Sequence, residues 1–267
     1  MDDTLLGHLA ALRRAILRAA AGVALLLVPG FLAAPLAIRA LVRLAVPESL
    51  GELHYFAPLE AFRAQLHVGF VLATAAAWPW VAAQAWGFVR PGLREDEARA
   101  LRRWIPLSTV LFLGGALFAC AAAMPLVMAF SASFEGPGLA PLIGLGHFLG
   151  LAGSLALGFG LMAQTPLVLA LAARLGLASA AGLRRGRPWA VLAILSLSAL
   201  LTPPDVASQL LLALPTLLLY ELGIRLAARA PSAPSSQGPT RSAGSPMTFE
   251  KEPEKDSTTR PPSVATS

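Results

Sequence analysis

The chain contains 267 residues, of which 56% are hydrophobic and only 13% carry a charge. This composition is typical of proteins that cross a membrane several times, and it excludes a soluble globular fold. The net charge of +6 does not indicate a nucleic-acid partner, because the arginines stand next to the ends of apolar runs, where membrane topology accounts for them.

Four long apolar runs come first along the chain, and each is long enough to span a bilayer. A transmembrane helix needs about 20 predominantly apolar residues to cross roughly 30 Å of hydrocarbon. The only cysteine, Cys120, lies in the third run, so we expect it to pack as a small apolar residue. The runs cover about Ala15 to Leu36, Gln65 to Val89, Ile105 to Phe130 and Phe148 to Ala173.

Two segments between these runs are expected on the far side of the membrane. In the first part of Ile38 to Pro58, apolar residues alternate with charged residues, which predicts an interfacial helix. Ser131 to His147 is rich in glycine and proline, which predicts a loop or a short helix against the membrane surface. Glu60 stands just before the second run, where an acid can cap the start of that helix.

A short apolar hairpin follows the fourth run. Its arms, Trp189 to Leu201 and Val206 to Tyr220, hold 13 and 15 residues, fewer than the roughly 20 of an ordinary span. Pro203 and Pro204 lack the amide hydrogens that would continue the first arm as a helix. Asp205 comes directly after them, where an aspartate can cap the second arm and favour the positive end of its dipole.

The two arms bring the number of predicted spans to six, so both termini lie on the same side. Of the arginines next to the spans, fourteen stand on that side and three on the other, and the positive-inside rule then makes the termini cytoplasmic. We therefore expect a cytoplasmic N-terminus (1–14), a six-helix transmembrane domain (15–229) and a cytoplasmic tail (230–267). Pro, Ser, Thr, Gly and Ala dominate the tail, which predicts that it is disordered.

Polar residues within this apolar background are candidates for function. Gln164 lies inside the fourth run, where an amide either hydrogen-bonds to a neighbouring helix or faces a polar recess. Glu221 ends the sixth span at the expected cytoplasmic interface. Three acids, Glu95, Asp96 and Glu97, interrupt an arginine-rich cytoplasmic loop. They can pair with those arginines or receive a cationic ligand, and the residue types alone favour the pairing.

Motifs for catalysis are missing from the sequence. The chain has no His-Glu-x-x-His for zinc, no Gly-x-Ser-x-Gly for a serine nucleophile, and no second intramembrane acid to pair with Asp205. The sequence therefore predicts a protein that is not an enzyme and that needs no cofactor.

Ordered motifs over about residues 5 to 225 carry a resemblance to one family. They are His8-Leu9-Ala10-Ala11-Leu12-Arg13, Pro58-Leu59-Glu60-Ala61-Phe62, Trp86-Gly87-Phe88-Val89-Arg90-Pro91-Gly92-Leu93 running into Glu97, Phe159-Gly160, Gln164-Thr165-Pro166, Arg187-Pro188, Leu201-Thr202-Pro203-Pro204-Asp205 with Ser208-Gln209, Pro215 and Tyr220-Glu221. In this order and spacing, the chain resembles the TatC subunit of the bacterial twin-arginine protein translocase.

The resemblance implies both a fold and a function. The fold is an all-α polytopic membrane protein, with six transmembrane helices forming a concave cup and the last two helices short. Members of the family bind the paired arginines of export signal peptides at the cytoplasmic face of the bacterial cytoplasmic (inner) membrane. They assemble with TatA-like and TatB-like single-span subunits, as several copies within the complex, and use the proton motive force to export folded proteins.

The resemblance also implies roles for individual residues. Glu97 matches the loop acid that holds the signal peptide, Phe88 and Arg13 match other residues of that surface, and Glu95 stands beside Glu97. Residues that the resemblance marks as polar or structural positions are Gln164, Asp205, Pro203, Pro204, Gln209 and Glu221.

Two positions depart from the family pattern. Ala11 replaces the usual glutamate of the amino-terminal motif, and Gln164 replaces a glutamate that many members have. The loss of one carboxylate removes a charge-assisted contact of about 1.5 to 3 kcal/mol, for which Glu95, Asp96, or Asp2 and Asp3 could compensate. Two alternatives stay open: a divergent paralogue with altered signal recognition, and a small-solute secondary transporter, although we find no internal repeat and only Gln164 near a midplane.

Overall fold

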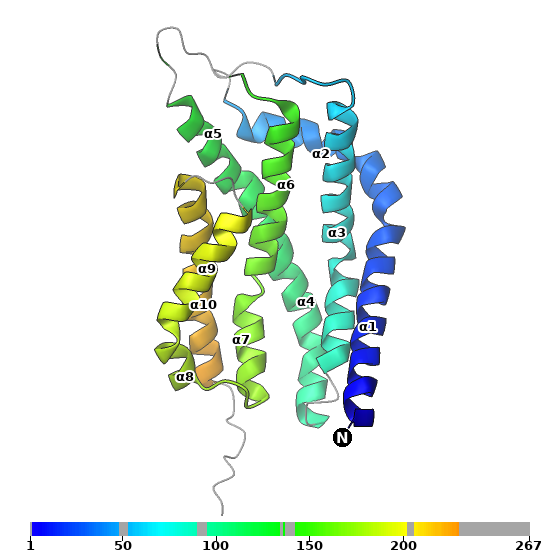
Figure 1. The fold of residues 1–267 in the computed structure, drawn as a ribbon, viewed down its shortest axis with the longest axis vertical. Helices are drawn as coiled ribbons and strands as arrows, with labels where there is room; N and C mark the ends of the chain where they lie inside the picture. The colour runs from blue at the N-terminus through cyan, green and yellow to red at the C-terminus, as the bar shows by residue number, and fades with distance from the viewer. Residues whose placement is uncertain are drawn as a thin grey trace, which may run out of the picture. The chain divides into compact units, whose positions relative to one another are not determined.

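The computed structural model describes residues 2–47, 53–89, 95–133, 136, 142–201 and 206–229, and these residues are almost entirely helical (Figure 1). Five of the helical segments are long and apolar enough to cross a membrane, and the segment Arg187–Leu200 is a shorter apolar helix. The all-α polytopic fold is confirmed. The helices are α1 (Asp2–Leu25), α2 (Leu27–Ala45), α3 (Glu60–Val89), α4 (Glu95–Phe118), a π-helix (Ala119–Ala123), α5 (Met124–Ala132), α6 (Leu145–Met162), α7 (Thr165–Arg174), α8 (Ala180–Arg185), α9 (Arg187–Leu201) and α10 (Val206–Arg229).

The first predicted span differs from the sequence expectation, because it is divided between α1 and α2. The helix breaks at Leu26, since Pro29 has no N–H to donate to the carbonyl of Leu25. At this break the amide of Leu26 donates to the carbonyl three residues earlier, that of Val23, at 3.0 Å. By length and composition Leu27–Ala45 is apolar enough to cross a membrane, but the arginine-bearing helix α1 is the one that runs alongside α3, and α2 turns across it (Figure 1).

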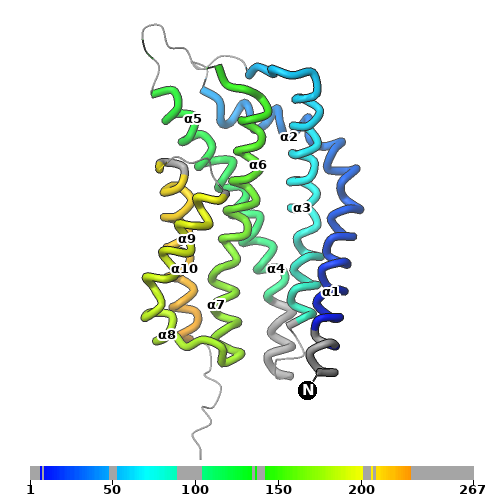
Figure 2. The backbone as a smooth tube through the Cα atoms, in the orientation of Figure 1, coloured from blue at the N-terminus to red at the C-terminus, as the bar shows by residue number. Residues whose placement is uncertain are grey.

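Helix α2 crosses α3 at close range. Gly30 and Gly69 make this possible, because a Cβ atom at Gly69 would lie 2.8 Å from the Cα of Phe31. Pro35 cannot donate to the carbonyl of Phe31, and the side-chain amide of Gln65 on α3 donates to that carbonyl instead, at 3.3 Å. Beyond Pro35 the helix continues to Ala45, so the predicted interfacial segment from Ile38 is the end of α2, which runs across the direction of α3 (Figure 2).

Prolines also shape the third and fourth spans. Pro125 lies just after the π-helix, whose wider turn leaves room for the proline ring against the carbonyl four residues earlier. Pro166 removes the bond to the carbonyl of Met162 and separates α6 from α7. Even so, Leu145–Arg174 forms one spanning segment of 30 residues.

The hairpin at the end of the domain has one short arm and one longer arm. Helix α9 has 15 residues, close to the predicted length, but α10 has 24 and continues past Tyr220 to Arg229. Its last turns contain leucine, alanine and arginine, which favour helix, and Gln209–Arg229 is itself long and apolar enough to cross a membrane. The hairpin tip, residues 202–205, lies outside the described part of the chain.

The N-terminal end of α3 is tied to the start of α6. Glu60 accepts hydrogen bonds from the amides of Phe56 and Ala57, at 2.6 and 3.3 Å, and so makes the predicted cap of α3. Its second carboxylate oxygen accepts from the amide of Gly146, at 2.8 Å. One side chain thus satisfies free amides at the beginnings of two helices.

The core lies where α3, α4, the π-helix and α6 meet, and it is built largely from aromatic rings, leucine, methionine and alanine. Large apolar side chains also cover the outer surfaces of the helices. Leu32, Leu200 and Leu218 are 73%, 80% and 73% exposed. Such a surface would aggregate in water but matches the hydrocarbon of a bilayer. Cys120 is half-buried and packs against the core, as predicted.

Candidate functional site

A groove of about 310 Å³ lies between α1 and α3, towards the end at which the chain begins. Helix α1 contributes positions 11, 14, 15 and 18, a spacing that places them on one face of the helix. The final turns of α3 form the other wall. The groove is lined by Ala11, Arg14, Ala15, Arg18, Gln84, Gly87 and Phe88.

The groove therefore brings together two motifs that are far apart in the sequence, the amino-terminal motif and the motif that runs into the first loop. Phe88 is half-buried and lines the groove opposite Ala11. Arg13 is exposed on α1 and is not among the residues that line the groove. Glu95 and Glu97 belong to the first turn of α4, but their side chains lie outside what the structure describes, so their contacts stay a prediction.

An aromatic cluster lies near the same end of α3 and α4. The rings of Trp86 and Trp104 meet edge to face, with centroids 5.2 Å apart and planes at 88°. The guanidinium of Arg174, at the end of α7, lies 4.8 Å from the centre of the Trp104 ring. Nε of Arg174 is buried and has no hydrogen-bond partner among the described residues, and the Trp104 ring offers the guanidinium a favourable cation–π contact. The cluster fixes the ends of three helices against one another.

Gln164 stands at the junction of α6 and α7, where it makes a polar contact between helices. Its Oε1 accepts a hydrogen bond from Oγ of Ser108 at 2.6 Å, and its Nε2 donates to the carbonyl of Ser108 at 3.1 Å. Ser108 in turn accepts from Nε1 of Trp78, at 3.2 Å. Of the two sequence interpretations, the contact between helices is therefore the one that the geometry supports.

Sequence reasoning missed Ser108 and Trp78, the partners of Gln164. Ser108 is only 3% exposed, and the indole of Trp78 stacks on Phe112 with centroids 3.7 Å apart. A lone serine in an apolar run gives no hint of which helix it faces. The tryptophan could have been suspected, because a buried indole N–H usually finds an acceptor.

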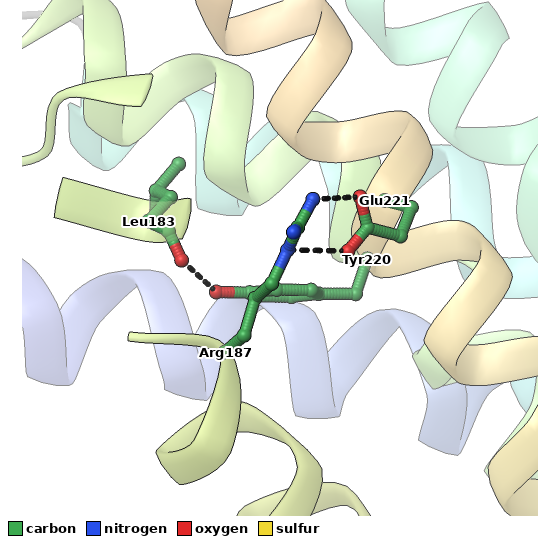
Figure 3. Close-up of polar contacts among 4 residues, drawn as sticks. All are labelled: Leu183, Arg187, Tyr220 and Glu221. Carbon is green, nitrogen blue, oxygen red and sulfur yellow. Dashed lines mark hydrogen bonds and ion pairs between the residues drawn. The ribbon is translucent and has the colours of Figure 1, made fainter. Parts of the chain in front are cut away.

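Glu221 forms an ion pair with Arg187 near the ends of α9 and α10 (Figure 3). The two contacts, Nε to Oε1 and Nη2 to Oε2, are both 2.8 Å, which is the forked geometry of a guanidinium on a carboxylate. The hydroxyl of Tyr220 donates to the carbonyl of Leu183 in α8, at 2.9 Å. The side chain of Glu221 is 41% exposed, and its position at the membrane interface stays a prediction.

The remaining predicted polar residues belong to the hairpin. The side-chain amide of Gln209 donates to the carbonyl of Leu195, at 3.0 Å, and so joins α10 to α9. Asp205, Pro203 and Pro204 lie outside the described residues. Within the described part of the chain, no group of three His, Cys, Asp or Glu side chains could hold a metal ion.

Comparison with known proteins gives a consistent result. Residues 7–215 match the family model of the Sec-independent protein translocase protein (TatC). A relative in Azotobacter chroococcum, a "Sec-independent protein translocase protein TatC", is 32% identical over 85% of this chain and 90% of its own length. A TatC protein of Carboxydothermus hydrogenoformans is 37% identical over 63% of this chain and 70% of its own length.

A solved structure gives the same answer for the fold. The crystal structure of a twin-arginine translocase receptor, TatC, is similar with a TM-score of 0.75 and 26% identity. The similarity covers 82% of this chain and 97% of that one.

Proposed function

Because the chain belongs to the TatC family and is thereby a subunit of the twin-arginine protein translocase, we propose that it receives twin-arginine signal peptides where the first half of α1, the end of α3 and the start of α4 lie together. The observation that carries this proposal is the groove in which Ala11 and Phe88 meet. These residues come from two separate motifs of the family resemblance, and the fold brings them to one surface.

The acids of α4 are the best candidates for the arginines of the signal peptide. The groove itself contributes Arg14 and Arg18, which repel a cationic ligand. Glu97 lies in the first turn of α4, which follows α3 after a short connection. A carboxylate there can accept two parallel hydrogen bonds from a guanidinium. We therefore place the paired arginines on Glu97 and Glu95, with Phe88 and Arg13 bordering the bound peptide.

The wider roles follow from membership of the translocase. We infer that the chain lies in the bacterial cytoplasmic membrane with both termini in the cytoplasm, because of its arginine distribution. We also infer that it acts as receptor and scaffold rather than as an enzyme. Its partners are TatA-like and TatB-like single-span subunits, further copies of itself, and folded precursors moved by the proton motive force. The exposed apolar faces of its helices offer surfaces on which single spans can pack.

Photocrosslinking tests the proposed receptor site directly. A photoreactive residue at Phe88 is expected to crosslink a precursor with an Arg-Arg signal, and to crosslink a Lys-Lys precursor much less. The same probe at Leu218, an exposed residue of α10, is the control. Equal crosslinking of the two precursors at Phe88 would place the recognition site elsewhere.

Cysteine labelling tests the orientation. In a Cys120→Ala background, single cysteines at Ser267 and Glu135 are expected to react from the cytoplasm and from outside, respectively. Labelling of both from the same side would contradict the proposed topology.

A further inference from the structure

The groove between α1 and α3 extends beyond the end that Arg14 and Arg18 line. A second groove, of about 520 Å³, continues along the same two helices, and Arg18 lines both. From Arg18 to Leu26 the second groove follows α1 for roughly 12 Å, at a rise of about 1.5 Å per residue. The two helices thus form one elongated depression that has a polar end and an apolar end.

The polar end has positive charge and hydrogen-bond donors. Arg14 and Arg18 are both exposed, and the amide of Gln84 stands across from them on α3. The described residues that line this end include no carboxylate. A ligand that fits here carries negative charge, and phosphate oxygens suit guanidinium groups in particular.

The apolar end is lined by apolar residues, apart from Arg18 at its start, and many of these are small. Ala21 and Gly22 on α1 lie across from Ala76 and Ala77 on α3. The indole of Trp80 closes the groove, since a Cβ at Gly22 would overlap this ring and since its Nε1 donates to the carbonyl of Arg18 at 2.8 Å. Trp80 remains about half exposed (49%), so the groove stays open along its side.

We propose that this depression binds an anionic phospholipid, with its phosphate on Arg14 and Arg18 and one acyl chain along Gly22, Ala76 and Trp80. The charge of the mouth selects an anionic headgroup, and the apolar continuation selects a ligand whose charge is joined to a hydrocarbon chain. Basic pockets between helices at a membrane interface are suited to such headgroups. The lipid neutralises two arginines next to the surface on which we place the signal peptide.

Native mass spectrometry of the full chain, purified in detergent and mixed with phosphatidylglycerol or phosphatidylcholine, tests the charge requirement. We expect phosphatidylglycerol to bind more tightly. The double variant Arg14→Gln/Arg18→Gln should weaken its binding about fivefold per arginine, or about 25-fold in total. The matched control is Arg225→Gln/Arg229→Gln, which removes the same charge from exposed positions of α10 and should leave binding unchanged. Equal losses in the two double variants, or equal binding of the two lipids, would overturn the proposal.

The acyl chain is tested separately. Ala21→Phe/Ala76→Phe fills the apolar end and should also weaken phosphatidylglycerol, whereas Ala33→Phe, at an exposed alanine of α2, should not. Excess glycerol phosphate, which has the headgroup chemistry without a chain, should not displace the lipid. Displacement by glycerol phosphate would show that the groove binds an anion without needing the acyl chain.

The remaining candidate occupant is the apolar stretch of a signal peptide. A synthetic signal peptide that displaces phosphatidylglycerol from the wild type, and that loses its own binding in Ala21→Phe/Ala76→Phe, would assign the groove to the peptide and overturn the lipid proposal. Retention of the lipid while the peptide binds would support it.

Discussion

Gln164 and Ser108 hold each other by two hydrogen bonds, one to the side chain of the serine and one to its backbone carbonyl. The amide thus uses both its acceptor and its donor on one residue of a neighbouring helix. A glutamate could reproduce the first contact, but an ionised carboxylate has no donor for the second.

This geometry predicts that Gln164→Ala lowers the free energy of unfolding by about 0.5 to 2 kcal/mol, the range of hydrogen bonds between membrane helices. Gln164→Glu should also destabilise the protein at neutral pH, because its carboxylate would face the carbonyl of Ser108. Thermal unfolding in detergent measures both effects. Gln84→Ala, which changes a groove residue of α3, is the control and should have little effect on stability. If both Gln164 variants were as stable as the wild type, the hydrogen bonds between Gln164 and Ser108 would not contribute to stability.

The ion pair of Arg187 with Glu221 is expected to contribute little to stability in spite of its forked geometry. The two side chains are 50% and 41% exposed, and exposed pairs contribute about 0 to 1 kcal/mol. A double-mutant cycle with Arg187→Gln and Glu221→Gln, followed by thermal unfolding at low and high salt, measures the coupling. A coupling well above 1 kcal/mol that persists at high salt would mean that the pair is shielded from water, in a membrane or in an assembly.

Glu97→Gln should lower the binding of an Arg-Arg precursor while folding is kept, because the size of the side chain is conserved and its charge is lost. A drop of about 1.5 to 3 kcal/mol corresponds to the loss of a charged hydrogen bond. Binding of the precursor to purified protein is the measurement, and unchanged thermal unfolding is the control. Unchanged affinity would support the reading of the chain as a divergent paralogue.

Ala11→Glu tests the opposite change, the addition of a carboxylate, and the structure sets how large a gain in precursor affinity we expect. The new carboxylate would share one face of α1 with Arg14 and Arg18, three and seven residues further on. These arginines would take up part of its charge, so we expect the affinity for an Arg-Arg precursor to rise by less than the roughly 1.5 kcal/mol of an unshared contact. The triple variant that also carries Arg14→Gln/Arg18→Gln should gain more. A larger gain in the single variant would mean that the arginines do not reach position 11.

The hairpin tip gives a prediction that rests on the sequence. Replacing Pro203 and Pro204 by alanine permits one long helix in place of α9 and α10 and should abolish assembly of the complex. Asp205→Asn, which can still cap a helix, should be milder. Blue-native electrophoresis of the membrane complex compares the variants. Equal loss from the two changes would give Asp205 a role that depends on its charge.

The sequence by itself determined the all-helical polytopic class, the short ninth helix, the cap by Glu60 and the family, because hydropathy, proline and motif residues act locally and leave their pattern along the chain. It also marked Phe88 and Gln164 as candidate residues, whose roles stay predictions.

Only the tertiary structure decided what these residues contact. The partner of Gln164 is 56 positions away on another helix. The two grooves exist because Ala11, Gly22 and Ala77 are small residues at the places where α1 and α3 lie side by side. Contacts between helices depend on the rotation of each helix about its axis, and in an apolar span that rotation is set by packing against neighbours rather than by the local sequence.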